Sequence, residues 1–141
     1  MPAAALLLAA CAGLDAAPPD HLSNTTWRLQ AIQSMDDAQG TARVRDSRPF
    51  TLRFGTDHRV NLQLDCNRAS GEWKAQSGPG DGGSLTFGPI TATRALCAPP
   101  HLDERIVRDL AYVRSYRIID GKLFMSLMAD GGIYEWIPHH E

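Results

Sequence analysis

The sequence lacks an excess of charge of either sign. Its 141 residues include 14 Lys and Arg against 16 Asp and Glu, which gives a formal net charge of -2. A dedicated nucleic-acid binder usually gathers a basic excess on one face, whereas the basic residues here are scattered along the chain. We therefore expect no nucleic-acid partner.

Long apolar runs are also missing. The longest covers residues 1–10 and consists mainly of Ala and Leu, whereas a membrane-spanning helix needs about 20 apolar residues. A run of this length and composition is typical of the apolar region of a signal peptide. We therefore predict that residues 1–10 are a signal peptide, with the departure that no Lys or Arg precedes the run.

This run leads directly into a cysteine. Leu8, Ala9, Ala10 and Cys11 resemble the lipobox of bacterial lipoproteins, whose cysteine is acylated and becomes the mature N-terminus. Residues 11–21 are then a flexible tether that reaches at most about 35 Å. Because Ala12 replaces the Asp that retains enteric lipoproteins in the inner membrane, the resemblance favours the periplasmic face of the outer membrane. The alternative is an ordinary signal peptide followed by an incidental cysteine.

Cysteine is scarce as well, with three in the chain. If Cys11 carries the lipid, Cys66 and Cys97 remain, and the oxidising periplasm favours a disulfide between them. Two buried free thiols are the alternative. A catalytic Cys–His pair is not expected, because no base has a defined place beside either cysteine.

Metal and cofactor signatures are missing too. The sequence has no zinc-ligand spacing and no phosphate-binding loop, and it offers no nucleophile, base and orienting group at credible spacing. The acidic pair at residues 36–37 is interpreted as solvated surface, and the terminal segment 139–141 as a frayed terminus rather than a metal site. We therefore predict no metal site, no cofactor and no enzymatic activity.

Alternation of apolar and polar residues predicts most of the domain. A strand with one buried face has this period of two, and residues 60–66, Val-Asn-Leu-Gln-Leu-Asp-Cys, show it most clearly. We expect the buried row to end on Cys66 and the chain to turn through residues 67–71. Further strands are expected at residues 22–32, 50–54, 72–74, 85–87, 116–119, 122–128 and 133–136, with loops at 34–48 and 76–83.

One segment changes period. Between residues 102 and 113 the apolar positions fall on one helical face; they are Leu102, Ile106, Val107, Leu110 and Val113. The sequence therefore predicts a single helix that covers an open side of the sheet. The length allows one domain, which we place at residues 22–137, followed by a tail at 138–141.

Several short motifs follow one another through this domain. They are a Leu-to-Trp opening at residues 22–27, a Pro-to-Phe strand at 49–54, Asp65-Cys66-Asn67 with Gly71 and Trp73, Thr93 with Cys97, the helix, and an aromatic ending at 116–136. In this order they resemble the META domain family, typified by a heat-shock lipoprotein. The departures are one extra residue in the opening, Asp65 where the family has Gly, and Trp73 where it has Tyr.

The resemblance implies a fold and a set of motif residues. The fold is mainly β (α+β), a small antiparallel barrel-like sheet of about seven to eight strands with one helix packed against it. The motif residues carried over are Trp27, Asn67, Gly71, Trp73 and Thr93. The resemblance also implies similarity to pilot lipoproteins of the outer membrane and a family without established catalytic machinery.

Two classes of function remain. The first is a monomeric, non-enzymatic binding or adaptor module of the periplasm with a role in stress. It would bind an envelope protein or an apolar ligand. A groove lined by Trp27, Phe54, Trp73 or Trp136 would suit it. The alternative is a proteinaceous inhibitor of a secreted or periplasmic hydrolase, for which a protruding loop at residues 76–83 would be suitable.

Overall fold

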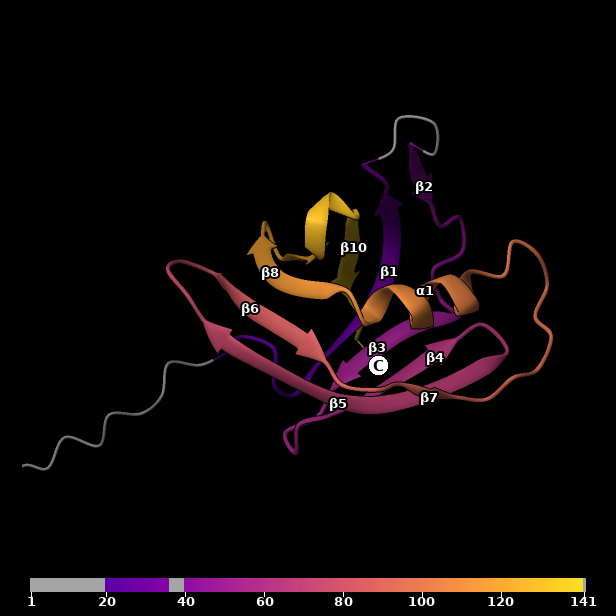
Figure 1. Cartoon of the computed structure of the whole chain (residues 1–141), viewed down its shortest axis with the longest axis horizontal. Helices are drawn as coiled ribbons and strands as arrows, with labels where there is room; N and C mark the ends of the chain where they lie inside the picture. Colours follow the sequence, from indigo (N-terminus) through magenta and orange to yellow (C-terminus); the bar gives the residue numbers. More distant parts are fainter. Residues whose placement is uncertain (1–19, 36–39, 141) are drawn as a thin grey trace, which may run out of the picture.

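The computed structural model describes residues 20–35 and 40–140 (Figure 1). The predicted signal peptide, Cys11 and most of the tether lie outside the described residues, as do Asp36, Asp37 and Glu141. Within the described part of the chain, no helix is long and apolar enough to cross a membrane.

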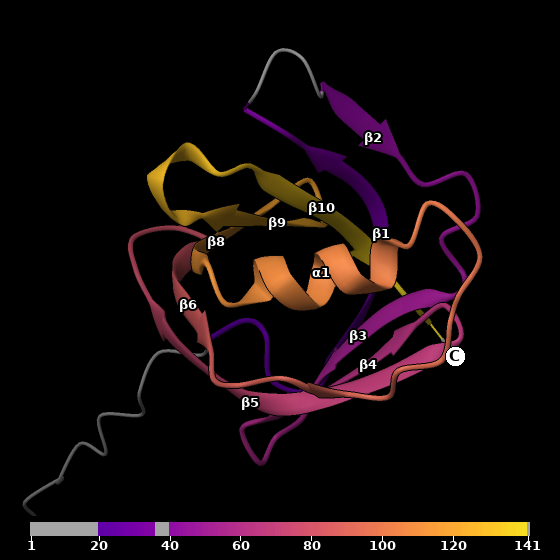
Figure 2. The same ribbon diagram turned by 45° about the vertical axis from the view of Figure 1, so that its right-hand side comes forward.

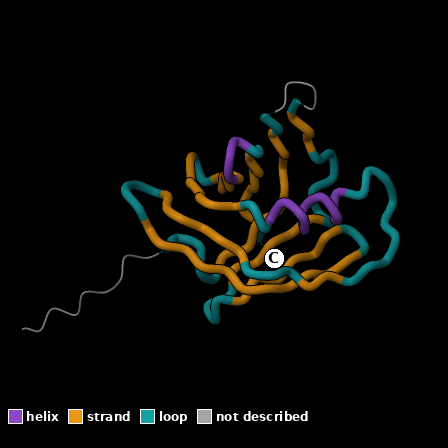
Figure 3. Tube along the Cα trace, in the orientation of Figure 1, coloured by secondary structure: helices purple, strands orange, loops and turns teal. Residues whose placement is uncertain are grey.

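In the described residues, the domain has ten strands and one α-helix. The strands are β1 (Thr25–Gln33), β2 (Thr41–Arg43), β3 (Phe50–Phe54), β4 (Arg59–Leu64), β5 (Asn67–Ser77), β6 (Gly82–Phe87), β7 (Thr91–Ala92), β8 (Val113–Ile119), β9 (Lys122–Leu127) and β10 (Ile133–Pro138). The α-helix is α1 (Leu102–Leu110), and a 3-10 turn, η1 (Met128–Asp130), precedes β10. Figure 3 shows the strands curving around the molecule with α1 among them.

Eight of the strands close into an antiparallel barrel. Their order is β1, β3, β4, β5, β6, β8, β9 and β10, and β10 pairs back with β1. β2 pairs with the second half of β1, and β7 pairs with the first half of β5. The predicted fold, an antiparallel barrel of seven to eight strands with one helix, is therefore confirmed.

Large side chains fill the interior of the barrel. Trp73, Trp136, Tyr116 and Phe54 are all at most 1% exposed. Phe54 meets Trp73 edge to face, with ring centroids 5.0 Å apart. An eight-stranded barrel is just wide enough for side chains to fill it, and apolar residues at alternate strand positions supply them. The core thus follows from the alternation seen in the sequence.

Helix α1 lies across the ring of strands in Figure 2. Ile106 and Leu110, on its buried side, belong to the barrel core and are 0% and 2% exposed. Near the C-terminal end of α1, the Tyr134 hydroxyl of β10 donates a hydrogen bond to Asp109 Oδ2 at 2.6 Å. The helix ends three residues before the predicted boundary, because Val113 already begins β8.

Two local predictions are wrong. The loop expected at residues 34–48 contains the short strand β2, Thr41–Arg43. Residues 67–71 do not turn; they form the first half of β5, an eleven-residue strand, and the turn consists of Asp65 and Cys66. Asp65 adopts a left-handed conformation with φ of 57°, which Asp tolerates better than most residues. The buried row of β4 therefore ends on Leu64, and Cys66 is exposed.

Candidate functional site

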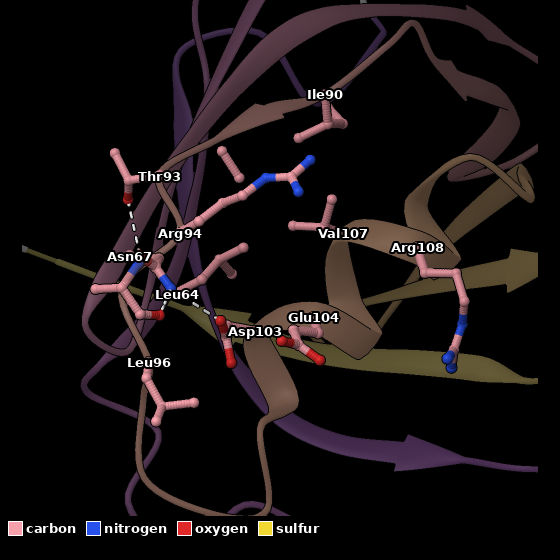
Figure 4. A pocket seen from close by; sticks show the side chains of 12 residues that line it. Leu64, Asn67, Ile90, Thr93, Arg94, Leu96, Asp103, Glu104, Val107 and Arg108 are labelled. Carbon is pink, nitrogen blue, oxygen red and sulfur yellow. Dashed lines mark hydrogen bonds between the residues drawn. The ribbon is translucent and has the colours of Figure 1, made fainter.

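The candidate site is a pocket of about 410 Å³ between the segment 90–96 and the first turns of α1 (Figure 4). Its apolar lining comes from Leu64, Ile90, Ala92 and Val107, and its charged lining comes from Arg94, Asp103, Glu104 and Arg108. Leu96 borders the same pocket and is 88% exposed, the most exposed large apolar side chain in the described part of the chain.

Asn67 attaches the segment 90–96 to the barrel. Its Oδ1 accepts hydrogen bonds from the Ala95 backbone N–H at 2.8 Å and from the Thr93 hydroxyl at 2.9 Å. Its Nδ2 donates to the Ala95 carbonyl and to Asp103 Oδ2, both at 2.9 Å. Asn67 is 3% exposed, so these partners satisfy an amide that is out of reach of water. One side chain therefore joins β5, the segment 90–96 and α1.

A disulfide reinforces the same attachment. Cys66, in the turn before β5, is bonded to Cys97, and their Cα atoms lie 5.6 Å apart. Cys97 is 5% exposed, whereas Cys66 is exposed. The Thr93 hydroxyl accepts a hydrogen bond from the Arg68 backbone N–H at 2.9 Å. Together with Asn67, these contacts clamp both ends of the segment 93–97 against the start of β5.

Gly71 permits the close approach of the chain before this segment. A Cβ atom at position 71 would lie 2.7 Å from Ile90 Cδ1 and 2.9 Å from the Pro89 carbonyl oxygen. Both distances are shorter than real Cβ contacts, so any larger residue would push residues 89–90 outwards. Glycine at position 71 therefore sets how closely the pocket wall packs on β5.

The structure brings some of the predicted motif residues together and separates others. Asn67, Gly71 and Thr93 all hold the pocket wall, beside the disulfide. Trp73 lies in the barrel core at 1% exposure, and Trp27, 5% exposed, donates from Nε1 to the Thr25 hydroxyl at 2.8 Å. The motif thus combines a clamp for the pocket wall with two tryptophans that support the barrel.

The aromatic residues that were expected to line a groove do not line this pocket. Phe54, Trp73 and Trp136 are buried in the barrel and do not contribute to the lining. Trp27 borders a second pocket of about 420 Å³, together with Arg53, His139 and neighbouring residues. The Arg53 guanidinium is already held there by Thr26 Oγ1 and Asn24 Oδ1, at 3.1 and 2.9 Å.

The charges around the first pocket differ in how they are neutralised. Asp103 accepts from Asn67, and Arg108 Nε lies 3.2 Å from Asp109 Oδ1. Within residues 20–35 and 40–140, neither the Arg94 guanidinium nor the Glu104 carboxylate has an ion-pair or hydrogen-bond partner. Arg94 therefore presents a free cation above an apolar floor, with an acidic residue on the facing helix.

Acid–base chemistry is not concentrated at the pocket. Tyr134, which is bonded to Asp109 of α1, has a pKa raised chiefly by burial and further by this hydrogen bond. That hydroxyl anchors α1 to β10 and does not line the pocket. Across the described ranges, no three His, Cys, Asp or Glu side chains are grouped so that they could hold a metal ion.

Sequence reasoning did not single out most of the pocket. Ile90, Arg94, Leu96, Glu104 and Val107 come from a strand end, an irregular segment and a helix, and no period relates them. The sequence does contain one signal for the pocket wall. Cys66 with Asn67, and Thr93 with Cys97, belong to the same series of motifs, which indicates that residues 93–97 are held at the start of β5.

These features define the class of the protein as a small β-barrel domain. They are the closed antiparallel barrel, the helix across the ring of strands, and the clamp that the disulfide supports. The chain belongs to the META domain family, whose family model matches residues 20–137. It is 31% identical over 104 residues to "Heat shock protein HslJ" of Escherichia coli (strain K12). That match covers 72% of this chain and 66% of the relative, slightly less than two thirds of its length.

Two solved structures share the fold. The NMR structure of a protein from Burkholderia xenovorans has a TM-score of 0.69 and 20% sequence identity, with 86% of each chain covered. The crystal structure of a DUF4847 family protein from Bacteroides vulgatus has a TM-score of 0.58 and 10% identity, with 84% of this chain and 94% of that chain covered. At these identities the likeness concerns the fold alone.

Proposed function

We propose that this chain is a non-enzymatic, lipid-anchored adaptor of the cell envelope that binds a partner protein under stress. The observation that carries the proposal is Leu96, which is 88% exposed on the rim of a pocket with an apolar lining. A single exposed leucine is ordinary on a protein surface. Leu96 differs because the pocket beside it offers further apolar area, as binding sites usually do.

The rigidity of the site supports the same function. Asn67, Thr93 and the disulfide fix the pocket wall against β5. A wall that is already ordered loses little conformational freedom when a partner binds. The barrel interior is filled by Trp73 and Trp136, which favours a partner at the surface over an apolar ligand inside the barrel.

Sequence features and a relative support the setting. The lipobox resemblance at Cys11 supports an anchor at the periplasmic face of the outer membrane, and similarity to a protein named as a heat shock protein supports a role in stress. Replacement of Cys11 by Ala should move the protein from the membrane fraction to the soluble periplasmic fraction. Unchanged membrane fractionation would rule out the anchor.

The adaptor function is tested by chemical cross-linking in intact cells, with a C-terminal tag, before and after heat stress. One recurrent envelope protein should be recovered with the wild type. Its yield should fall with Leu96→Ser and stay unchanged with Ile119→Ser, which removes an apolar side chain, 43% exposed, that is not part of the pocket lining. Equal recovery with both variants, or no recurrent protein, contradicts the proposal.

A second candidate is an inhibitor of a hydrolase. The hairpin of β5 and β6 projects from the barrel in Figure 1, and its tip, residues 78–81, is rich in glycine. Such a tip could enter an active-site cleft. This function requires that the captured partner is a hydrolase and that deletion of Pro79 and Gly80 abolishes its inhibition, while Leu96→Ser does not.

A further inference from the structure

The edge of β7 that does not face β5 has no partner strand. β5 pairs with β4 along one edge and with β6 and then β7 along the other. β7 itself pairs with β5 alone among the described strands. Its second edge is thus an open strand edge, which can accept another extended chain.

The hydrogen-bond pattern identifies the backbone groups on that edge. Thr91 lies opposite Ser70, and the Thr93 N–H donates to the Arg68 carbonyl at 2.9 Å. In an antiparallel pair, successive residues direct their N–H and C=O groups to opposite edges. The backbone groups of Ala92 and Arg94 therefore point away from β5, and no described residue binds them.

The side chains along this edge alternate as well. Ala92, Arg94 and Leu96 lie two residues apart and line the pocket, and Figure 4 shows Arg94 and Leu96 projecting on the side of α1. Thr93 and Ala95 between them also border the pocket, but the Thr93 hydroxyl and the Ala95 backbone N–H are bonded to Asn67 of β5. Residues directly opposite each other on paired strands have neighbouring side chains. An added strand would place one side chain beside each of these three residues.

The charge of Arg94 indicates which side chains the added strand would carry. Arg94 has no ion-pair partner in the described part of the chain, and it stands between Ala92 and Leu96, which are apolar. We propose that the pocket binds an extended protein segment that adds as a strand to the β7 edge and carries an apolar, an acidic and an apolar residue at positions i, i+2 and i+4. Such strand addition is a common mode of peptide recognition.

This inference deepens the proposed adaptor function and rests on it for the biological partner. The acidic residue pairs with Arg94, and the two apolar residues cover Ala92 and Leu96. Glu104, on the facing helix, disfavours a second acidic residue on that side. A segment bound as a helix would use none of the free backbone groups of Ala92 and Arg94.

The test begins with a phage-displayed library of random octapeptides, selected on the full chain in detergent micelles. The enriched octapeptides should show the alternating apolar–acidic–apolar pattern. Their affinity should fall about fivefold with Arg94→Glu and stay unchanged with Arg45→Glu, which makes the same charge change at an exposed arginine outside the pocket.

Two further measurements test the backbone pairing between the octapeptide and β7. N-methylation of the octapeptide at alternate residues should weaken binding about tenfold, and N-methylation at the residues between should have little effect. Amide hydrogen exchange at Ala92 and Arg94 should slow on binding, with Thr93, already bonded to Arg68, as the internal reference.

Three outcomes overturn strand addition: no enrichment over the Arg94→Glu chain, enriched peptides with helical spacing, or binding that leaves exchange at Ala92 and Arg94 unchanged. None of them touches the adaptor function, which stands if Leu96 is needed for recovery of an envelope protein. Conversely, octapeptide binding without a cellular partner upholds the strand site and contradicts the adaptor function.

Discussion

Replacement of Asn67 by Asp isolates the side chain that holds the pocket wall. The change exchanges Nδ2 for an oxygen and alters the shape very little. It removes the hydrogen bonds to the Ala95 carbonyl and to Asp103 Oδ2, both 2.9 Å long. It also places a second carboxylate beside Asp103, which is 7% exposed.

The expected loss of stability follows from these contacts. A hydrogen bond between neutral groups contributes about 1 kcal/mol net, and one to a charged group about 1.5 to 3 kcal/mol. The bonds to Ala95 and Asp103 together amount to about 2.5 to 4 kcal/mol, and repulsion between the carboxylates adds to this.

Urea unfolding of the oxidised protein, followed by circular dichroism, measures the effect. Asn61→Asp is the matched control, because Asn61 is exposed on β4 and undergoes the same chemical change. A loss of less than about 1 kcal/mol for Asn67→Asp, or an equal loss for Asn61→Asp, would refute the reasoning.

Three further predictions concern the clamp and the helix anchor. Gly71→Ala should destabilise the protein by about 1 to 3 kcal/mol, while Gly88→Ala, whose Cβ would find its nearest atom at 3.7 Å, should be nearly neutral in the same urea assay. Replacement of Cys66 and Cys97 by Ser should lower the free energy of unfolding by at most about 3.7 kcal/mol, the loop-closure value for a separation of 31 residues. A reductant should lower the stability of the wild type to that of the variant. Two free thiols in the denatured, oxidised protein would contradict the disulfide. Burial and Asp109 raise the pKa of Tyr134 above its ordinary 10.0. The folded state therefore favours the protonated phenol, and the stability of the protein falls as the pH rises above about 10. Tyr134→Phe should flatten that part of the profile of stability against pH, and an unchanged profile would contradict the raised pKa.

The barrel could be predicted because its strands carry their own signal. Leu52 and Phe54 alternate with polar residues, and β3 occupies the predicted residues 50–54. The Asp120-Gly121 dipeptide between the strands predicted at 116–119 and 122–128 is typical of a two-residue hairpin turn; it joins β8 and β9, and both residues have positive φ angles, of 52° and 75°. Such patterns are local, so they survive without knowledge of the neighbouring strands.

The start of β5 could not be predicted in the same way. Asn67, Arg68, Ala69, Ser70 and Gly71 are mostly small or polar residues, which favour turns in isolation. The structure keeps them extended because they pair with β4 on one side and with β7 on the other. Tertiary pairing outweighs local preference here, as it often does in sheets.

The pocket escaped prediction for a related reason. β7 has two residues, Thr91 and Ala92, too few to show a period. Leu96 and Arg94 become site residues because Asn67, far away in the sequence, fixes the segment that carries them. The motif spacing contained the attachment points of this segment, but not the space that the attached segment encloses with α1.

Photo-cross-linking from position 96 tests the adaptor function most directly. A photoreactive amino acid is placed at Leu96 or, as a control, at Ile119, and living cells are irradiated during heat stress. The adaptor function predicts that position 96, and not position 119, cross-links to one envelope protein. The strand site at β7 predicts in addition that Arg94→Glu weakens this adduct while Arg45→Glu does not. The absence of an adduct at position 96, or the same adducts from both positions, would contradict the adaptor function.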